Sequence, residues 1–138
     1  MGALYYYTAK LDRPVRISAE SYCSASYYSY SGYWSYYLPA RFSNDGTTIL
    51  YFTDSSKIED TSYYSGTLMQ YKIANEETIR IGSDILTSID GEYVGSYPKY
   101  DGFWYYKYAT LDDEGRAIFD LMYWNGEAAS TLANDIFK

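Results

Sequence analysis

The chain has 138 residues, a length typical of one domain, and 47% of them are hydrophobic, which is enough to build a core. Its formal net charge is −7, and its lysines and arginines are scattered rather than clustered. Because phosphate contacts require Lys and Arg, we expect no nucleic-acid partner. No apolar run approaches the roughly 18 residues that span a bilayer, so we expect no membrane insertion.

The residue types that are absent or rare exclude several kinds of chemistry. The chain has no histidine, which removes Ser-His and Cys-His nucleophiles, the common zinc sites and a histidine pH switch. Cys23 is the only cysteine, so no internal disulfide forms, and nothing basic lies beside it to activate the thiol. We expect no catalytic residue, no metal site and no cofactor, and we assign Cys23 no role.

Tyrosine dominates the apolar fraction, with 21 copies. Aromatic side chains favour pleated, half-buried surfaces, and no segment has helical spacing of any length. The sequence therefore predicts a mostly β fold.

The first predicted element, in chain order, is a pair of strands around a polar turn in residues 4–21, LYYYTAKLDRPVRISAES. The start of the chain lacks the charged region and apolar run of a secretory signal. If the parent protein is exported, we expect its signal to lie outside these residues.

The next segment, SASYYSYSGYWSYYLP in residues 24–39, consists mostly of Tyr and Ser. This composition is typical of recognition loops, because Tyr gives a large contact area at low entropy cost and Ser adapts its hydrogen bonds. One interpretation is a contact surface, with Trp34 as the anchor and the turn near Ser31 and Gly32 most exposed. The other is a long hairpin whose tyrosines pack on a neighbouring sheet. The candidate binding residues are Tyr30, Tyr33, Trp34, Tyr36 and Tyr37.

Residues 42–85 predict three strands. Asp45 and Gly46 form a turn, and strands are expected at 48–53, 67–73 and 78–82. Residues 55–65 are expected to be a solvated polar loop. The stretch GSDILTSI, at 82–89, is expected to form at most a short turn.

Residues 99–136 predict an equivalent set, with an Asp101-Gly102 turn and strands at 103–109, 118–124 and 129–133. Asn125-Gly126 indicates a hairpin turn between the last two strands. The acidic run Asp112 to Glu114 is interpreted as a solvated turn, with weak calcium binding as the alternative. ANDIF, at 133–137, is expected to form at most a short turn.

These segments are copies of one repeat. The shared leucine is Leu4, Leu68 and Leu121, and the shared aromatic three residues later is Tyr7, Tyr71 and Trp124. The two Asp-Gly turns are 56 residues apart. The full unit is an Asp-Gly turn, a strand, a variable loop and a strand–turn–strand, which is an antiparallel meander, and residues 4–21 contain only its second half.

FSNDGTTILYFTD and the strands that follow it, through residue 85, resemble one blade of the TolB-like β-propellers. Residues 99–136 look like a second blade, and residues 4–21 look like the closing half of another. Asn44 and Tyr100 stand where that family often has Pro. The repeats are also similar to the Tyr-rich, propeller-like repeats of bacterial cell-surface proteins. DGFWYYKYATLDDEGRA is similar to aromatic cell-wall-binding repeats, but their length, about 20 residues, does not match the 56-residue spacing.

The resemblance implies one all-β domain over residues 1–138, an antiparallel meander of propeller-like blades with repeat units 4–21, 42–85 and 99–136. A propeller has four to eight blades, so we expect an incomplete propeller or an open sheet assembly. Exposed edges invite pairing with other chains, so self-association through sheet edges is expected unless further repeats exist.

The expected function is a noncatalytic binding or scaffolding module of an extracytoplasmic bacterial protein, which recognises a protein or peptide through its inter-strand loops. The alternative is a carbohydrate or cell-wall module that stacks Tyr and Trp on sugars. An enzyme would need active-site residues from outside this chain.

Overall fold

The computed structural model describes residues 2–22, 24–28, 33–37, 40–43, 45–87 and 102–137, and their regular structure is entirely β-strand. The strands are β1 (Gly2–Tyr6), β2 (Val15–Ser21), β3 (Ser24–Tyr28), β4 (Tyr33–Tyr37), β5 (Arg41–Phe42), β6 (Thr48–Phe52), β7 (Ser56–Lys57), β8 (Tyr64–Lys72), β9 (Glu77–Leu86), β10 (Phe103–Leu111), β11 (Ala117–Trp124) and β12 (Ala129–Phe137). All pairs are antiparallel. The predicted all-β, antiparallel fold is confirmed over these ranges, and they contain no helix that could cross a membrane.

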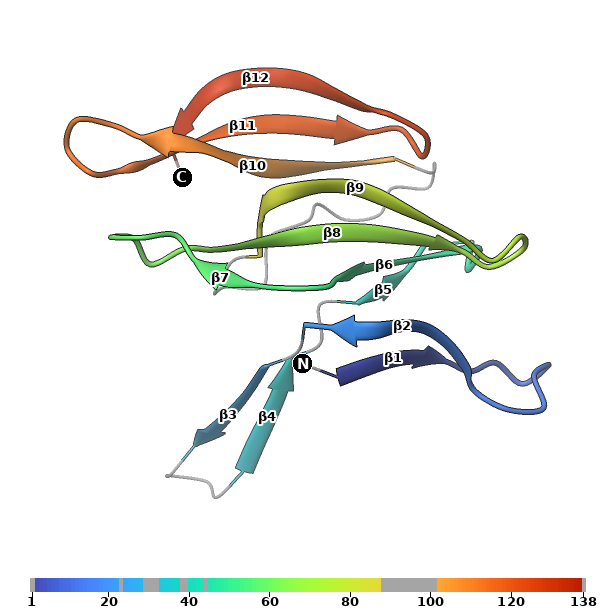
Figure 1. Cartoon of the computed structure of the whole chain (residues 1–138). Coiled ribbons are helices and arrows are strands. Elements are labelled where there is room, and N and C mark those ends of the chain that lie inside the picture. Colours follow the sequence, from blue (N-terminus) through green and yellow to red (C-terminus); the bar gives the residue numbers. More distant parts are fainter. Residues whose placement is uncertain are drawn as a thin grey trace.

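The strands stack in three layers, which Figure 1 shows from bottom to top. The first layer is the pair β1–β2, the second contains β5 to β9, and the third contains β10 to β12. The second and third layers were expected to be separate sheets, but they are joined into one open sheet of order β12-β11-β10-β9-β8-β6-β5, with β7 on β8. Strands β9 and β10 join the two layers as an antiparallel pair in which Lys107 lies opposite Ile85.

The second and third layers use the same strand register, as the repeat predicts. Ile49 lies opposite Tyr71 in the second layer, and Phe103 lies opposite Trp124 in the third. Two residues along, the opposite pairs are Tyr51 with Met69 and Tyr105 with Met122. The aligned positions of the two repeats therefore occupy matching places in their sheets.

Strand β6 is buried at all five positions because it is covered on both faces. Ile49 and Tyr51 pack toward the first layer with Leu4 and Tyr71, while Leu50 and Phe52 pack toward the third. A strand buried on both faces reads as a continuous apolar run, here ILYF, rather than as an alternation. Burial also raises the pKa of the Tyr51 hydroxyl, so the phenol stays neutral in the core.

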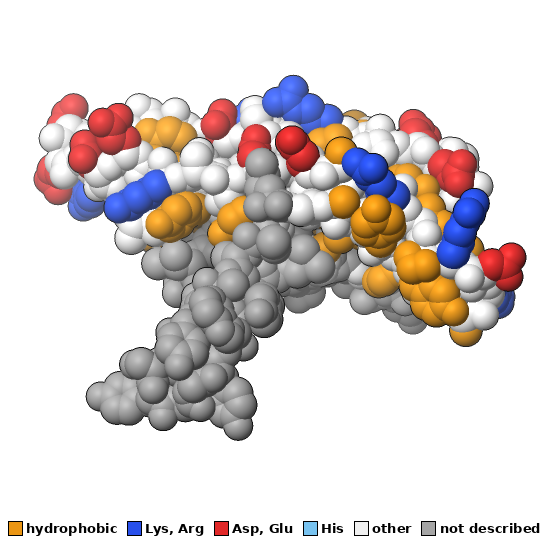
Figure 2. Space-filling model, turned by 60° about the horizontal axis from the view of Figure 1, so that its bottom comes forward, with side chains coloured by type: hydrophobic (Ala, Val, Ile, Leu, Met, Phe, Trp, Pro, Cys, Tyr) orange, Lys and Arg blue, Asp and Glu red, His pale blue; other side chains and the backbone are white. Residues whose placement is uncertain are grey.

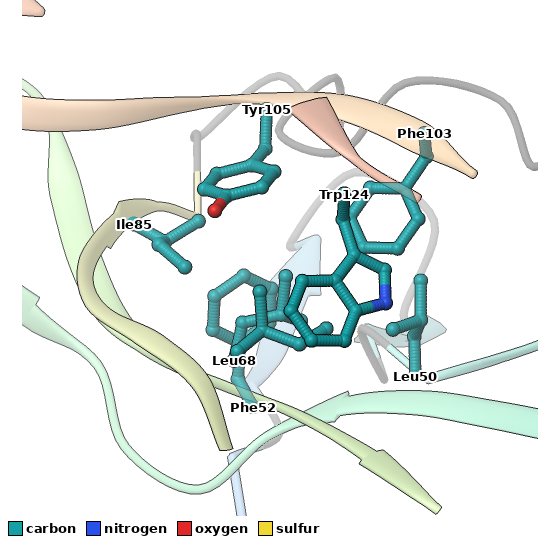
Figure 3. Close-up of a cluster of buried hydrophobic side chains, with 8 residues drawn as sticks. Leu50, Phe52, Leu68, Ile85, Phe103, Tyr105 and Trp124 are labelled. Atoms are coloured by element: carbon teal, nitrogen blue, oxygen red, sulfur yellow. The ribbon is translucent and has the colours of Figure 1, made fainter. Parts of the chain in front are cut away.

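The core between the second and third layers is built from facing aromatic and aliphatic side chains. Figure 3 shows Phe103, Tyr105 and Trp124 directed toward Leu50 and Leu68. Phe52 is fully buried in the same cluster. Truncating such a buried aromatic to Ala costs about 3–5 kcal/mol, so this seam contributes much of the stability.

The stretches GSDILTSI and ANDIF, expected to form short turns, lie mainly within long strands instead. Residues 82–86 belong to β9 and residues 133–137 belong to β12. At equivalent places, Asp84 and Asp135 have φ of 59° and 58°, a left-handed conformation that Asp tolerates better than most residues. The strands β8–β9 and β11–β12 also shift register along their length. The chain therefore bends at these sites without leaving the sheet.

The loop at residues 55–65 was expected to be solvated, but part of it belongs to the core. Strand β7 pairs with β8, and Ile58 is buried against Leu86 and Phe119. The ring of Tyr63 meets Phe119 edge-on at 5.4 Å. Ile58 and Tyr63 stand among polar residues in the sequence, so their burial was not predicted. They pack on the end of the third layer.

The Tyr/Ser segment forms a hairpin of its own. Strands β3 and β4 pair in register from Ser24 opposite Tyr37 to Tyr28 opposite Tyr33, as a separate two-stranded sheet. Figure 1 shows the pair projecting away from the three layers.

Candidate functional site

A cleft of about 480 Å³ lies where the turns of the second and third layers meet. Its second-layer residues come from the start of β6, the end of β8 and the β8–β9 turn, and its third-layer residues from the β11–β12 turn. They are Thr47, Thr48, Gln70, Lys72, Ala74, Asn75, Asn125, Gly126 and Glu127. The repeat therefore brings turns about 50 residues apart to one site, because each layer places its turns at the same end.

The cleft has a polar group at its base, where the surrounding seam is apolar. Gln70 is only 1% exposed, and its Oε1 accepts a hydrogen bond from Nε1 of Trp124 at 3.2 Å. The Trp124 indole thereby fixes a hydrogen-bonding amide at the base of the cleft.

The third-layer rim is held by an Asx turn. Asn125 Oδ1 accepts hydrogen bonds from the backbone N–H groups of Glu127 and Ala128, both at 2.8 Å. Gly126 has φ of 100°, a backbone conformation that residues with a side chain rarely adopt. The predicted Asn-Gly hairpin turn is confirmed, and it gives the cleft a wall with a defined conformation.

The second-layer rim is fixed by Asp45. Its Oδ1 accepts from Ser43 Oγ at 2.6 Å, from Thr47 Oγ1 at 2.7 Å and from the Thr47 backbone N–H at 3.0 Å. The hydrogen bond from the Ser43 hydroxyl, followed by those from Thr47, lowers the pKa of Asp45 to about 2. The predicted role of Asp45 as a turn former is confirmed, and Thr47 is thereby positioned on the cleft.

The charges of the cleft nearly cancel. Lys72 and Glu127 are its charged lining residues, and the remaining polar groups are hydroxyls and amides. Such a lining matches ligands that carry neutral donors and acceptors, as peptide groups and sugar hydroxyls do. It supplies no pair of convergent acids and no nucleophile next to a base.

A second, smaller groove of about 220 Å³ lies between the first layer and strand β5. Its lining is aromatic and aliphatic, and consists of Leu4, Tyr5, Tyr6, Tyr7, Ile17, Ala40, Phe42 and Ile49. Tyr5, Tyr7 and Phe42 are each about half exposed. In Figure 2, where the bottom of Figure 1 is turned forward, hydrophobic side chains gather to the right of the grey residues, the side on which the first layer lies.

The structure describes the backbone of four of the five predicted binding residues. Tyr33, Trp34, Tyr36 and Tyr37 all lie in β4, where Trp34 is paired with Tyr27. Tyr30 lies outside the described residues, as do Ser31 and Gly32 at the expected hairpin tip and Cys23. The assignment of these tyrosines and Trp34 as a contact surface remains a prediction.

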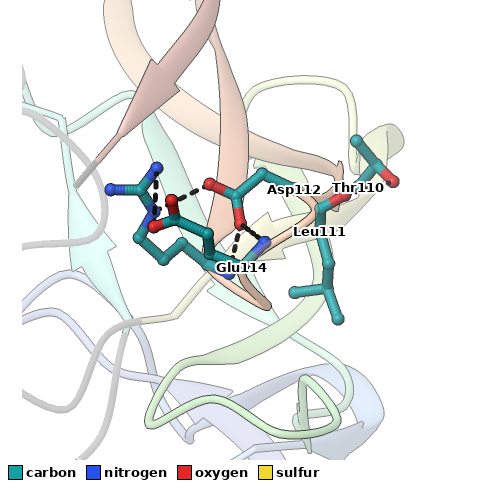
Figure 4. A network of polar contacts seen from close by, with 5 residues as sticks. Thr110, Leu111, Asp112 and Glu114 are labelled. Carbon is teal, nitrogen blue, oxygen red and sulfur yellow. Dashed lines mark hydrogen bonds and ion pairs between the residues drawn. The ribbon is translucent and has the colours of Figure 1, made fainter.

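The acidic turn between β10 and β11 is organised by Asp112. Its Oδ1 accepts from the backbone N–H groups of Glu114 and Arg116, and its Oδ2 accepts from Arg116 Nε at 2.7 Å (Figure 4). These backbone bonds, together with the Arg116 charge, lower the pKa of Asp112. Arg116 also pairs with Glu114 at 3.3 Å. Both oxygens of Asp112 already have partners, so the turn interpretation is favoured over calcium binding, and the described residues contain no metal-ligand cluster.

The cleft was not predicted from the sequence, although its Asn125-Gly126 turn was. Gln70 sits in the apolar strand between Met69 and Tyr71, where a polar residue on a buried face is uncommon. This polar residue in an apolar strand and the Asn-Gly turn of the following repeat were the two features of the sequence that pointed to the cleft. The packing of the two repeats against each other has no local signal in the sequence.

Family models, curated protein sequences and solved structures were all compared with this chain, and none of them matches it.

Proposed function

We propose that the chain is a noncatalytic binding module that recognises an extended peptide or protein segment through the turns around the cleft between the second and third layers. The observation that carries this proposal is Gln70. Its amide is held by Trp124 Nε1 at the base of a cleft whose other lining groups are mostly hydroxyls and amides.

An extended peptide suits the lining of this cleft. Each of its residues offers one N–H donor and one carbonyl acceptor, which match the hydroxyl and amide groups of the lining. Thr47, Asn75 and Asn125 add hydroxyl and amide groups around it. Lys72 and Glu127 stand at the same cleft and would select charges of opposite sign on the flanking side chains.

The wider parts of the proposal rest on resemblance. The three stacked layers and their shared register support an interpretation of the repeats as propeller-like blades of the TolB-like kind. The resemblance to Tyr-rich bacterial surface repeats supports an extracytoplasmic location. We also propose that the chain has no hydrolase activity on glycosides, esters or peptides, and turnover that a single substitution abolishes would contradict this.

The binding proposal is tested by selecting peptides of about eight residues from a random displayed library and measuring their affinity by calorimetry. Lys72→Ala and Glu127→Ala should each weaken the selected peptides by roughly tenfold, the scale of a well-placed charged contact. The matched controls are Lys57→Ala and Glu59→Ala, which alter exposed charges of the second layer away from the cleft. Equal binding by all four variants, or no selected peptide, would contradict the proposal.

A second candidate is carbohydrate binding, which the aromatic groove at β1 and β5 favours. Half-exposed Tyr and Phe rings offer apolar faces on which sugar rings stack. Titration with soluble chito- and cello-oligosaccharides should then be weakened by Phe42→Ala and unaffected by Lys72→Ala. Oligosaccharide binding that Phe42→Ala leaves intact would exclude the groove.

A further inference from the structure

The layers are stacked in one direction, and the repeat shows this position by position. Met69 and Tyr71 of the second layer face the first layer, and the equivalent Met122 and Trp124 of the third layer face the second. On the opposite side, Leu68 of the second layer faces the third, and Leu4 of the first faces the second. At these positions each layer has one face for the layer before it and another for the layer after it.

The stack has two outer faces. The residues on them correspond, in the repeat alignment, to residues that are packed between layers elsewhere in the stack. On the first layer, Tyr5 and Tyr7 are equivalent to Met69 and Tyr71, but they are 53% and 59% exposed. We call these two residues, which also line the groove at β5, the first outer face. They alternate with Leu4 and Tyr6, which pack against the second layer, and the Tyr6 and Tyr71 rings lie 6.0 Å apart.

The third layer has the complementary exposed positions. Three residues of the third layer occupy these positions: Trp104, Leu121 and Tyr123. In the second layer the equivalent residues are Leu50, Leu68 and Gln70, and there the third layer packs over them. We call these three residues the last outer face. Trp104 is 43% exposed although it is a large aromatic, and Leu121 and Tyr123 are partly exposed. They lie opposite the set Phe103, Tyr105, Met122 and Trp124 that faces the second layer.

We propose that copies of this chain associate head to tail, with the first outer face of one copy packed on the last outer face of the next. The contact continues an interface that the chain already forms twice, between its first and second layers and between its second and third. A second copy fits this contact, because the chain itself carries both halves of it. The interface is heterologous, so it joins unlike faces rather than a face with itself.

Face-to-face stacking also differs from the pairing of sheet edges. Edge pairing would extend a sheet through backbone hydrogen bonds along β12, whereas stacking buries Tyr5, Tyr7 and Trp104 side chains. Charged substitutions at these three exposed positions therefore separate the two modes. Large aromatic residues dominate interface energetics, so one charge placed among them should weaken association by roughly tenfold or more.

The test uses two blocked variants of the full chain. Tyr5→Glu with Tyr7→Glu blocks the first outer face, and Trp104→Glu blocks the last. Sedimentation is measured from about 1 μM to about 1 mM, the range in which moderate affinities are resolved. Circular dichroism and thermal unfolding check that each variant keeps the fold of the unaltered chain.

The unaltered chain should associate with increasing concentration, and each blocked variant alone should remain monomeric. An equimolar mixture of the two variants should form a one-to-one dimer and stop there, because each retains one usable face. A monomeric unaltered chain overturns the proposal, as does a blocked variant that still associates. A mixture that stays monomeric overturns it too, since unlike faces would then not recognise each other.

Discussion

The indole Nε1 of Trp124 donates a hydrogen bond to Oε1 of Gln70 across 3.2 Å, between residues 54 positions apart in the chain. Trp124 is equivalent to Tyr71 in the repeat, and Tyr71 makes the corresponding contact with the first layer. The two seams therefore share one geometry, but the later seam alone pairs the shared aromatic with a buried amide among the described residues. That amide forms the base of the polar cleft.

Gly66 should be intolerant of any side chain. A Cβ at this position would overlap the backbone carbonyl of Asp54, which cannot move without disturbing the bond from the Thr67 N–H to Asp54 Oδ1 at 2.6 Å. Gly66→Ala should lower the free energy of unfolding by about 1–3 kcal/mol, the usual cost of overpacking. The matched control is Gly2→Ala, where a Cβ would meet no atom within 4 Å. Urea unfolding measures both, and equal stabilities would contradict the close approach of β8 to Asp54.

Asp45 should make stability depend on pH in the acid range. Its folded pKa, about 2, lies below the ordinary value of 3.8, so its contribution is present above pH 3.8 and is lost as the pH falls through about 2. The stability difference between the unaltered chain and Asp45→Asn should therefore shrink over that window. Asp113→Asn, an exposed acid in another turn, controls for the loss of one negative charge. A difference that stays constant from about pH 6 to pH 2 would show that the Ser43 and Thr47 bonds do not hold the ionised carboxylate.

The hairpin β3–β4 should distinguish its two interpretations by stability. Replacing Tyr33 and Trp34 by Ala should leave the thermal midpoint nearly unchanged if these residues form a contact surface, and should abolish binding of a ligand that uses the hairpin. If the same change lowers the free energy of unfolding by about 3–5 kcal/mol, the residues are core. Trp124→Ala is the comparison for a buried Trp, because its side chain is 3% exposed.

The sequence predicted the strands better than it predicted their contacts. The alternation around Met69 and Tyr71 and the Asn125-Gly126 turn are local patterns, and both were placed correctly. Face-to-face packing of the layers was not predicted. Period-2 alternation shows which residues share a face of a strand, but it does not show which element covers that face. The Gln70 amide was missed for that reason. The bends at Asp84 and Asp135 were predicted to be turns, because a bend within a strand and a turn between strands both place a polar residue in an apolar run.

The most direct test of the cleft is a double-mutant cycle on Trp124→Phe and Gln70→Leu, measured by urea unfolding. Each single change leaves a buried polar group unpaired and should cost about 1–3 kcal/mol, while the double change removes both groups. The two effects should fall short of additivity by about 0.5–3 kcal/mol. A control cycle of Trp124→Phe with Tyr6→Phe, in the other seam, should be additive. Additivity within about 0.3–0.5 kcal/mol for Trp124 and Gln70 would contradict the face-to-face seam on which the cleft depends.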